Sequence, residues 1–413
     1  MAAGSWNKVY RRTSSSRLLI ITAFMGLLIG AAMIVRDLYP RVATRLDRRS
    51  IGCLAEEKYY GVLEKAGRRQ LLGKISTPLF DDTHFLLCDD IHAIWRRNPL
   101  QYSWPEAMLA KGIFLSYGRD NNQANLEALR EYCSKVITEL AITQSHSGVK
   151  TLDQTMIGET MIGLYEKTGI LKYRIAAEQL ATYLIDRNKI ETTSLSYRKG
   201  NPIRLADGIG MICPFLASYA KSFNYPEARR LAISQLKEFN RFGIDPKSGL
   251  PFHGYNPDLN FNPVGLVGWG RGTGWYAIGL IDTIASLSTQ DPNREELEDA
   301  ARALARSVVR CQRKDGGWGS MLTCPSQFDS SATAMIAYFL QRSINLGVIT
   351  KDYNQTVTRS LVSLRGVTRI NGDIDYAQGN CMDINRHSAQ YAPHVYAQGA
   401  ALAVFAITED PDQ

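Results

Sequence analysis

Residues 153–187 read DQTMIGETMIGLYEKTGILKYRIAAEQLATYLIDR, and this stretch contains a complete helical hairpin. Its apolar residues from Met156 to Leu164 recur at the spacing of one helix face. Gly169 then interrupts the pattern, and a second amphipathic helix is predicted from Tyr173 onward. The stretch therefore predicts two helices joined by a short turn.

The same plan repeats along most of the chain. Short polar or glycine-rich turns open helices rich in small and apolar residues, and a more charged amphipathic helix follows each of them. The six openings fall at Trp104, Asp153, Asp207, Arg271, Ser330 and about His394. They are roughly 50 to 65 residues apart, and strand patterns are scarce, which together predict an all-α protein built of helical hairpins.

Six hairpins in a row fit either an open superhelical solenoid or a closed toroid of inner and outer helices. The two arrangements differ in where they put the beginnings of the inner helices. A closed toroid gathers them around one cavity, whereas a solenoid spreads them along a ridge. Side chains far apart in the sequence meet only in the closed form.

A hydrophobic run of eighteen uncharged residues, 18–35, precedes the repeats. At about 1.5 Å rise per residue, a helix of this length just crosses a bilayer. We expect an uncleaved membrane anchor. The alternatives are a cleaved signal peptide, with Gly30-Ala31-Ala32 as its cleavage site, and a buried helix of a soluble protein.

Positive charge gathers around this run. The net charge is +8, and nine Lys and Arg residues lie within the first 49 positions and flank the run. A membrane surface explains them better than a nucleic acid does. The basic residues are balanced across the run, but a short basic tail is usually left in the cytoplasm. We therefore expect a single-pass protein of a bacterial inner membrane, with its main domain facing the periplasm.

The seven cysteines are dispersed and odd in number, with no CxxC pair and no Cys/His cluster in the sequence. This pattern argues against a zinc site and against a disulfide scaffold. We therefore expect no metal ion and no other cofactor.

Two acidic residues, Asp153 and Asp207, open consecutive inner helices. An Asp there ordinarily caps the helix by accepting hydrogen bonds from free backbone N–H groups. Thr151 and Gln154 already fit a capping box, however, which leaves Asp153 less needed as a cap. Two carboxyl groups across a sugar-sized cavity are what glycosidic chemistry uses, one to donate a proton and the other to hold the substrate or activate water. Two interpretations of Asp153 and Asp207 therefore remain open, a catalytic pair and two ordinary helix caps.

The densest group of candidate binding residues lies in residues 249–280, GLPFHGYNPDLNFNPVGLVGWGRGTGWYAIGL. Aromatic faces suit sugar rings, and Arg271 suits a carboxylate through paired charge-assisted hydrogen bonds. The other candidates there are His253, Tyr255, Trp269 and Trp275. The alternative is a loop across the barrel mouth with its tryptophans in the core. The remaining histidines, His387 and His394 among them, lack comparable neighbours in the sequence.

Four ordered segments resemble the unsaturated glucuronyl and rhamnogalacturonyl hydrolases, a family of glycoside hydrolases. They are LDQTMIGETMIGLYEKTGILKYRIAA (152–177), LADGIGMICPFLASYA (205–220), DPKSGLPFHGYN (245–256) followed by WGRGTGWYAIGLIDTI (269–284), and FDSSATAMIAYFLQRSINLGVI (328–349). The resemblance runs from about Trp104 to the C-terminal helix. It implies a closed (α/α)6 barrel without a metal ion, preceded in this chain by the transmembrane helix.

The resemblance also implies a reaction. Water adds to the C4=C5 enol ether of a terminal unsaturated uronic acid, which is thereby released from an oligosaccharide. Asp207 matches the general acid that protonates the double bond and then activates water, and Asp153 matches its carboxylate partner. The residues at matching substrate-binding positions are Trp104, His253, Trp269, Arg271, Trp275 and Ser330.

Three positions depart from the family pattern. Leu205 and Gly210 stand where family members often carry aromatic residues, and Asp329 replaces a commoner Glu. These changes open the site or remove stacking, so the resemblance leaves the sugar undefined.

Two other functions stay open beside the hydrolase. One is a polysaccharide lyase that cuts uronate polymers by β-elimination, and the other is a non-catalytic sugar-binding subunit of a membrane complex.

Together these features predict four segments of the chain. A basic tail spans residues 1–17, a transmembrane anchor 18–35, a juxtamembrane linker with the first helices 36–100, and the barrel 101–410. Tethering of the barrel suggests that it works beside a machine for polysaccharide synthesis or export.

Overall fold

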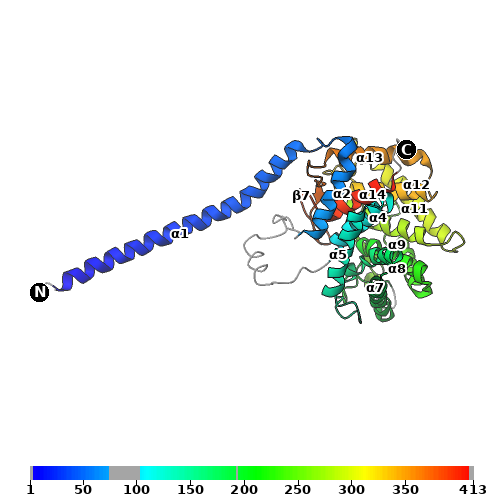
Figure 1. Ribbon diagram of the computed structural model, residues 1–413, viewed down its shortest axis with the longest axis horizontal. Coiled ribbons are helices and arrows are strands. Elements are labelled where there is room, and N and C mark those ends of the chain that lie inside the picture. The colour runs from blue at the N-terminus through cyan, green and yellow to red at the C-terminus, as the bar shows by residue number, and fades with distance from the viewer. Residues whose placement is uncertain (1–2, 74–102, 192–193, 409–413) are drawn as a thin grey trace. The chain divides into compact units, whose positions relative to one another are not determined.

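The structure is a computed structural model that describes residues 3–73, 103–191 and 194–408. The chain divides into two compact units, Met1–Ile51 and Gly52–Gln413 (Figure 1). The predicted boundary between residues 100 and 101 lies outside the described residues.

The first unit consists of one long helix, α1 (Ala3–Asp47), followed by the 3-10 helix η1 (Arg48–Ser50). Its segment Ser16–Val35 has a mean hydropathy of 2.7. Large apolar side chains of this segment, such as Leu19 and Leu27, are exposed. Among the described helices, this segment alone is long and apolar enough to cross a membrane, and it coincides with the predicted run.

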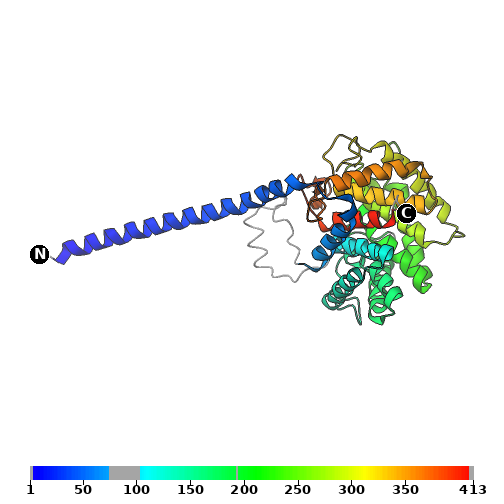
Figure 2. The ribbon, with the colours of Figure 1, turned by 45° about the horizontal axis from the view of Figure 1, so that its top comes forward.

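The second unit contains, within its described part, a closed ring of six inner helices. They are α4 (Trp104–Asp120), α6 (Gly158–Thr168), α8 (Ala206–Phe223), α10 (Gly270–Ser286), α12 (Ser330–Asn345) and α14 (Val395–Ile407). Each inner helix contacts the next one along the chain, and α14 contacts α4 (Figures 1 and 2). The ring is therefore closed, so the predicted (α/α)6 barrel is confirmed and the open solenoid is wrong.

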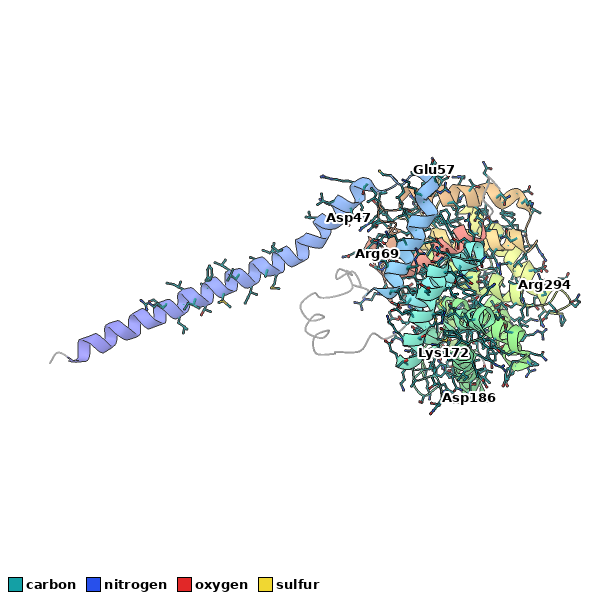
Figure 3. All side chains as sticks on the ribbon, viewed as in Figure 1. Asp47, Glu57, Arg69, Lys172, Asp186 and Arg294 are labelled. Atoms are coloured by element: carbon teal, nitrogen blue, oxygen red, sulfur yellow. The ribbon has the colours of Figure 1, made fainter. Side chains whose placement is uncertain are left out.

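The outer helices are amphipathic, as the sequence predicted. They are α2 (Glu56–Leu72), α5 (Gln123–Glu139), α7 (Leu171–Glu191), α9 (Pro226–Phe242), α11 (Arg294–Arg310) and α13 (Asn354–Gly366). In α11, Leu297, Leu304 and Val308 are buried at helical spacing against the inner ring. Charged side chains of α7, Lys172 and Asp186, lie at the periphery (Figure 3).

The sixth hairpin joins segments from opposite ends of the barrel sequence. α2 contacts α14 as well as α4 and α5. The Gln398 side chain of α14 donates a hydrogen bond to the carbonyl oxygen of Leu63 in α2, at 3.1 Å. α2 therefore completes the outer layer of the barrel, although it lies in the stretch 36–100 that the sequence assigned to the linker and first helices.

Ring closure depends on two glycines that face each other between α4 and α14. A Cβ atom added at Gly112 would collide with the carbonyl oxygen of Gly399, and one added at Gly399 would collide with the backbone at Met108. Only glycine permits backbones to approach this closely. The first and last inner helices therefore meet backbone to backbone.

The predicted hairpin boundaries agree closely with the observed ones. In residues 153–187, the 3-10 helix η2 (Leu152–Thr155) leads into α6, and Gly169 ends α6 at a positive φ of 67°. The second helix of that hairpin begins at Leu171, two residues before the predicted Tyr173. Such small offsets are usual at helix ends.

Strands are short and lie in the loops that precede inner helices. The described strands are β1 (Arg204–Leu205), β2 (Gly254–Asn256), β3 (Asn262–Val264), β4 (Ala377–Gln378), β5 (Cys381–Asp383), β6 (Arg386–His387) and β7 (Tyr391–Ala392). All pairs are antiparallel, in the orders β1-β2-β3, β4-β7 and β5-β6. The remaining 3-10 helices are η3 (Pro257–Leu259) and η4 (Lys351–Tyr353).

Candidate active site

The beginnings of the inner helices and the short strands gather at one end of the barrel. Asp207 lies in the first turn of α8, Arg271 in the first turn of α10, and Ser330 is the first residue of α12. Trp104 begins α4, and Asp153 lies in η2 just before α6. Repeat positions far apart in the sequence are thus brought together, as a closed ring requires.

Asp207 faces His253 across the junction of β1 and β2. The Nε2 atom of His253 lies 3.4 Å from Oδ2 of Asp207. The backbone N–H of Ala206 donates to the carbonyl of His253 at 2.9 Å, and Leu205 pairs with Gly254, so the start of α8 is fixed to the histidine loop. His253 is buried, and Oδ2 of Asp207 accepts no hydrogen bond from the described residues.

Asp153 is buried and is not the main cap of its helix. Thr151 and Gln154 form the predicted capping box, which satisfies the backbone there. The carboxyl group of Asp153 instead accepts hydrogen bonds from the Thr151 hydroxyl and the Trp104 backbone N–H. Burial raises the pKa of Asp153, while these hydrogen bonds and the charge of Arg198 act in the opposite direction. The structure thus gives Asp153 and Asp207 unlike surroundings.

A third carboxyl group, that of Glu106, lies near Asp153. Burial raises the pKa of Glu106 to about 7, and the negative charge of Asp153 adds to this effect. Its Oε2 atom finds no hydrogen-bond partner in the described part of the chain. The sequence pattern did not single out Glu106, because one Glu in the first turn of a helix is an ordinary feature.

Arg271 is buried and binds the segment that carries β4. Its guanidinium group donates to the carbonyl oxygens of Gln378 and Gly379, at 2.6 and 3.0 Å, and to the Tyr396 hydroxyl at 2.9 Å. The guanidinium carbon lies 4.9 Å from the ring centre of Trp269. These contacts give Arg271 a structural role, and the binding of a substrate carboxylate stays a prediction.

The three predicted tryptophans lie around Arg271. Trp269 and Trp275 are fully buried, and Trp104, which is half-buried, meets Trp275 edge to face at 5.5 Å between ring centres. Trp269 donates from Nε1 to the Gln378 side chain at 2.9 Å and packs against His253 at 4.7 Å. Trp104 is therefore the most accessible aromatic face of the three.

Ser330 and Asp329 are buried where α12 meets the β4 segment. Asp329 caps α12 by accepting from the backbone N–H of Ser331 at 2.9 Å, and it also accepts from the backbone N–H of Gln378 at 3.2 Å. The Ser330 N–H donates to the carbonyl of Tyr376 at 3.0 Å, while its hydroxyl finds no partner among the described residues. Asp329, a departure from the family pattern, thus joins two elements.

The departure at Gly210 has a steric cause. A Cβ atom added at this position would overlap the backbone and the ring of Trp275. α8 and α10 are packed too closely there for any side chain, so Trp275 occupies the space that an aromatic residue at position 210 would need.

The sequence analysis missed the contribution of residues 375–394. This segment brings Gln378, Cys381 and His387 to the site, with His387 packed on Trp269 at 4.7 Å and 5.7 Å from His253 between ring centres. Burial and, to a smaller extent, the neighbouring His253 together lower the pKa of His387 to about 4. His387 has no comparable neighbours in the sequence, and its neighbours in space could not be predicted, because loops without periodicity give no sequence signal for them.

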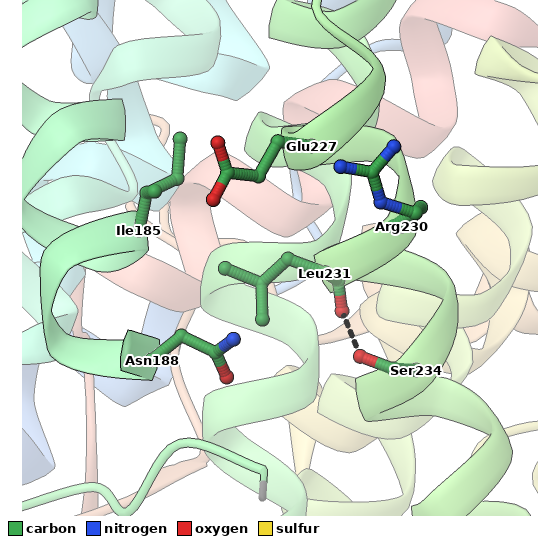
Figure 4. A pocket seen from close by; sticks show the side chains of 6 residues that line it. All are labelled: Ile185, Asn188, Glu227, Arg230, Leu231 and Ser234. Atoms are coloured by element: carbon green, nitrogen blue, oxygen red, sulfur yellow. Dashed lines mark hydrogen bonds between the residues drawn. The ribbon is translucent and has the colours of Figure 1, made fainter. Parts of the chain in front are cut away.

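Two hollows lie away from this end of the barrel. One, of about 240 Å³, lies between α7 and α9 and is lined by Ile185, Asn188, Glu227, Arg230, Leu231 and Ser234 (Figure 4). The other, of about 380 Å³, surrounds Lys111, Glu159 and Asp282. None of the predicted site residues lines either hollow.

Curated relatives match parts of the chain. Protein Atu3128 of Agrobacterium fabrum is 30% identical over 146 residues, which cover 33% of this chain and 62% of that protein. The unsaturated 3S-rhamnoglycuronyl hydrolase of Formosa agariphila is 25% identical over 185 residues, covering 42% of this chain and 48% of that protein. The chain thus matches about half to three fifths of the length of these relatives.

A solved structure shares the fold over most of the chain. A possible member of the GH105 family from Salmonella enterica serovar Paratyphi A has a TM-score of 0.72 and 18% identity, and the match covers 86% of this chain and 94% of that one. The model of Glycosyl Hydrolase Family 88 matches residues 85–408, which include all the predicted site residues. The chain therefore belongs to Glycosyl Hydrolase Family 88.

Proposed function

We propose that this enzyme removes a terminal unsaturated uronic acid from an oligosaccharide by hydrating its C4=C5 double bond. The observation that carries the proposal is the presence of two carboxyl groups, in unlike surroundings, at the beginnings of neighbouring inner helices. Asp207 has an oxygen without a partner among the described residues and stands beside His253, whereas the carboxyl group of Asp153 is held by hydrogen bonds from Thr151 and Trp104. The unpartnered oxygen suits Asp207 to proton exchange, and the fixed carboxyl group suits Asp153 to holding the substrate.

The proposed reaction begins with a proton transfer. Protonated Asp207 donates its proton to C4, and the positive charge that develops at C5 is shared with the ring oxygen. The Asp207 carboxylate then takes a proton from water as the hydroxyl adds to C5. The resulting hemiketal at C5 then opens. Ring opening leaves the anomeric carbon as an acyclic hemiacetal, which breaks down and releases the next sugar. Asp207 thereby returns to its starting protonation state.

The neighbours of Asp207 support this assignment. His253 lies close enough to orient the carboxyl group, and it is itself held by packing against Trp269. Trp104 offers an accessible aromatic face for a sugar ring. The relative from Formosa agariphila, which is named for activity on an unsaturated uronyl sugar, supports the same substrate class.

The direct test follows the ultraviolet absorbance of the conjugated double bond. We expect the full-length protein to abolish this absorbance on unsaturated oligosaccharides made by uronate lyases. A lyase would instead raise the absorbance on intact uronate polymers, and a non-catalytic sugar-binding subunit would leave both unchanged. Either of these results, obtained with folded protein, would overturn the proposal.

We further propose that α1 anchors the barrel in a bacterial inner membrane, with the barrel in the periplasm beside a polysaccharide synthesis or export machine. The length and apolar character of Ser16–Val35 support a membrane anchor. Membrane fractions washed at high pH should retain the protein, and protease added to spheroplasts should digest the barrel. Recovery of a soluble, N-terminally shortened protein would show instead that the segment is a signal peptide.

Chemical crosslinking in intact cells tests the proposed partnership and should capture polysaccharide-assembly proteins. Their absence from the crosslinked material would count against that partnership.

A further inference from the structure

Three side chains with metal-binding atoms meet beside Asp207. They are His253, Cys381 and His387, and their ligand atoms all lie within 4.8 Å of one another. The pairing of β5 with β6 sets Cys381 opposite His387. His253 comes from the loop before β2, so the cluster joins two loops that are far apart in the sequence.

The polar atoms of the cluster have few protein partners. Three buried nitrogen atoms of the cluster make no hydrogen bond to the described residues. They are both ring nitrogens of His387 and the Nδ1 atom of His253. The Cys381 sulfur donates only a weak hydrogen bond, to the carbonyl of Asp383 at 3.1 Å. Buried nitrogen atoms without partners are unfavourable, and a bound ligand at this position would satisfy them.

The donor set selects a class of metal ion. Two imidazoles and a thiolate suit Zn²⁺, whereas Mg²⁺ and Ca²⁺ prefer oxygen ligands. Zn–N and Zn–S bonds of about 2.0–2.3 Å place the ligand atoms of a tetrahedral site roughly 3.4–3.6 Å apart. The observed ligand atoms lie within 4.8 Å of one another, so a bound ion would draw them closer by at most about 1.4 Å.

We propose that His253, Cys381 and His387 bind a Zn²⁺ ion at the mouth of the barrel. Asp207 Oδ2 lies 3.4 Å from His253 Nε2, so a carboxylate stands next to the three ligands. Metal-bound histidines commonly carry such a carboxylate neighbour. This site was not expected from the sequence, because the cysteines and histidines form a cluster only after the ring has closed.

Zinc at this position has a consequence for catalysis, and this consequence rests on the proposed function. The ion would lie across the His253 ring from the carboxyl group that exchanges protons with the substrate. An ion with its ligands at the mouth of the barrel would obstruct the approach of the substrate to Asp207. Bound zinc therefore acts as an inhibitor.

The first experiment measures metal binding without any reference to activity. The full-length protein in detergent, freed of metal and kept reduced with a phosphine, is titrated with Zn²⁺ against a coloured chelator, and separately with Co²⁺. We expect one equivalent of each metal to bind, with a thiolate-to-cobalt charge-transfer band in the near ultraviolet. A cobalt complex without this band, or no binding at all, would refute the site.

Substitutions then identify the ligands. Cys381→Ser and His387→Gln should each weaken zinc binding by more than the roughly 10–100-fold lost with an outer-shell partner. Cys381→Ser should also abolish the charge-transfer band. The matched control is Cys324→Ser, which removes an exposed thiol outside the cluster. Unchanged affinity in both ligand variants, with native circular dichroism, would show that zinc binds elsewhere.

The last experiment separates the metal site from its effect on the reaction. Zinc should inhibit the loss of substrate absorbance, a chelator should restore it, and Cys381→Ser should resist inhibition. If zinc binds as described and hydrolysis continues unchanged, the site stands and its inhibitory role is wrong. If no substrate is hydrolysed even without metal, the function proposed above fails while the titrations still report on the site.

Discussion

Asp207 combines a buried imidazole neighbour with a carboxyl oxygen that accepts no hydrogen bond from the described residues. A group that only capped α8 would direct its oxygens at the first backbone N–H groups of the helix. The N-cap position of α8 is instead occupied by Leu205, and Asp207 lies within the first turn. The chemistry of the site is therefore tested most directly at this residue.

Asp207→Asn should abolish catalysis and preserve the fold. The amide cannot donate and recover a proton at neutral pH, so we expect the rate to fall by about 10²–10⁴-fold. Steady-state kinetics on an unsaturated oligosaccharide measure the loss, and Asp186→Asn on α7 controls for the removal of one charge. An Asp207→Asn enzyme with wild-type rate would assign the proton transfer to another group.

Glu106 should make the stability of the barrel depend on pH near neutrality. Its pKa of about 7 in the folded protein is above the value of an unfolded Glu, so the folded state binds the proton more tightly. Ionisation of the buried Glu106 therefore lowers the free energy of unfolding. This destabilisation is fully present above about pH 7 and disappears as the pH falls toward about 4.5. Glu106→Gln should therefore be more stable than wild type at alkaline pH, and this advantage should shrink on acidification.

Chemical denaturation of both proteins across this range measures the difference in the free energy of unfolding. Glu127→Gln, which removes an exposed carboxyl group of α5, is the control for general charge effects. A Glu106→Gln advantage that is constant with pH would mean that the Glu106 carboxyl group does not titrate there.

Sequence reasoning found the site residues that open inner helices or lie in the glycine-rich approach to α10. Asp153, Asp207 and His253 have this kind of position. Gln378 and His387 do not, because they lie in an irregular segment whose conformation is set by hydrogen bonds to Arg271 and Asp329. Those partners come from other repeats, and no local pattern predicts them.

Among the helices, α4, α6, α10 and α12 share a buried ionic cluster. The Nζ atom of Lys111 lies 2.7 Å from Glu159 and 2.9 Å from Asp282, and Tyr338 donates to Asp282 at 2.9 Å. Lys111 and Asp282 are nearly inaccessible to water. The cluster ties four inner helices together away from the end that holds the candidate active site.

Lys111→Ala should destabilise the barrel strongly, because it removes the nearest cation of the buried Asp282 carboxylate. The loss of one member of such a pair costs about 3–5 kcal/mol. Lys135→Ala is the matched control, since Lys135 forms an exposed pair with Glu131 on one helix. We expect that control to change the free energy of unfolding by about 0–1 kcal/mol. Thermal and urea denaturation of the two variants provide the comparison.

Arg271→Lys should loosen the segment from β4 to β7. A lysine offers one point charge in place of the planar fork that binds Gln378, Gly379 and Tyr396. Hydrogen exchange of residues 377–392 should accelerate, while exchange in α8 should stay slow. Trp269→Phe, which removes the hydrogen bond to the Gln378 side chain and part of the buried ring, leaves the Arg271 contacts in place and should cause a smaller change. Equal protection in wild type and Arg271→Lys would contradict this anchoring role.

The hairpins could be predicted because each helix carries its own periodic pattern and its own stop signal, as Gly169 illustrates. The position of α2 could not, since its partner α14 lies at the other end of the sequence. The short strands escaped prediction for a similar reason. Two or three residues are too few for an alternating pattern, and β1 exists only because β2 lies beside it.

At the scale of the whole molecule, the repeats left open whether the hairpins form a ring or an open superhelix. Local sequence cannot decide this, because the deciding contact joins Gly112 to Gly399. Closure also explains why α2 belongs to the barrel, as its buried side chains fill the space outside α4 and α14. They include Tyr59, Leu63 and Leu71.

Two truncations should therefore differ sharply. Removal of residues 1–51 deletes only the first unit, and we expect the barrel to keep its cooperative unfolding transition. Removal of residues 1–73 also deletes α2, whose large buried side chains contribute about 1.5–3 kcal/mol each. Calorimetry should then show a lower or absent transition. Similar melting of both shortened proteins would mean that α2 is dispensable.

The backbone contact between α4 and α14 also bears on how the protein is made. α4 emerges early from the ribosome, and its glycine face has no partner until α14 has been synthesised some three hundred residues later. During that interval the growing chain exposes apolar helix surfaces that the finished ring buries. Chains in this condition are prone to aggregate. Biosynthesis of this protein should therefore depend on a chaperone that shields the nascent barrel until its last helix arrives.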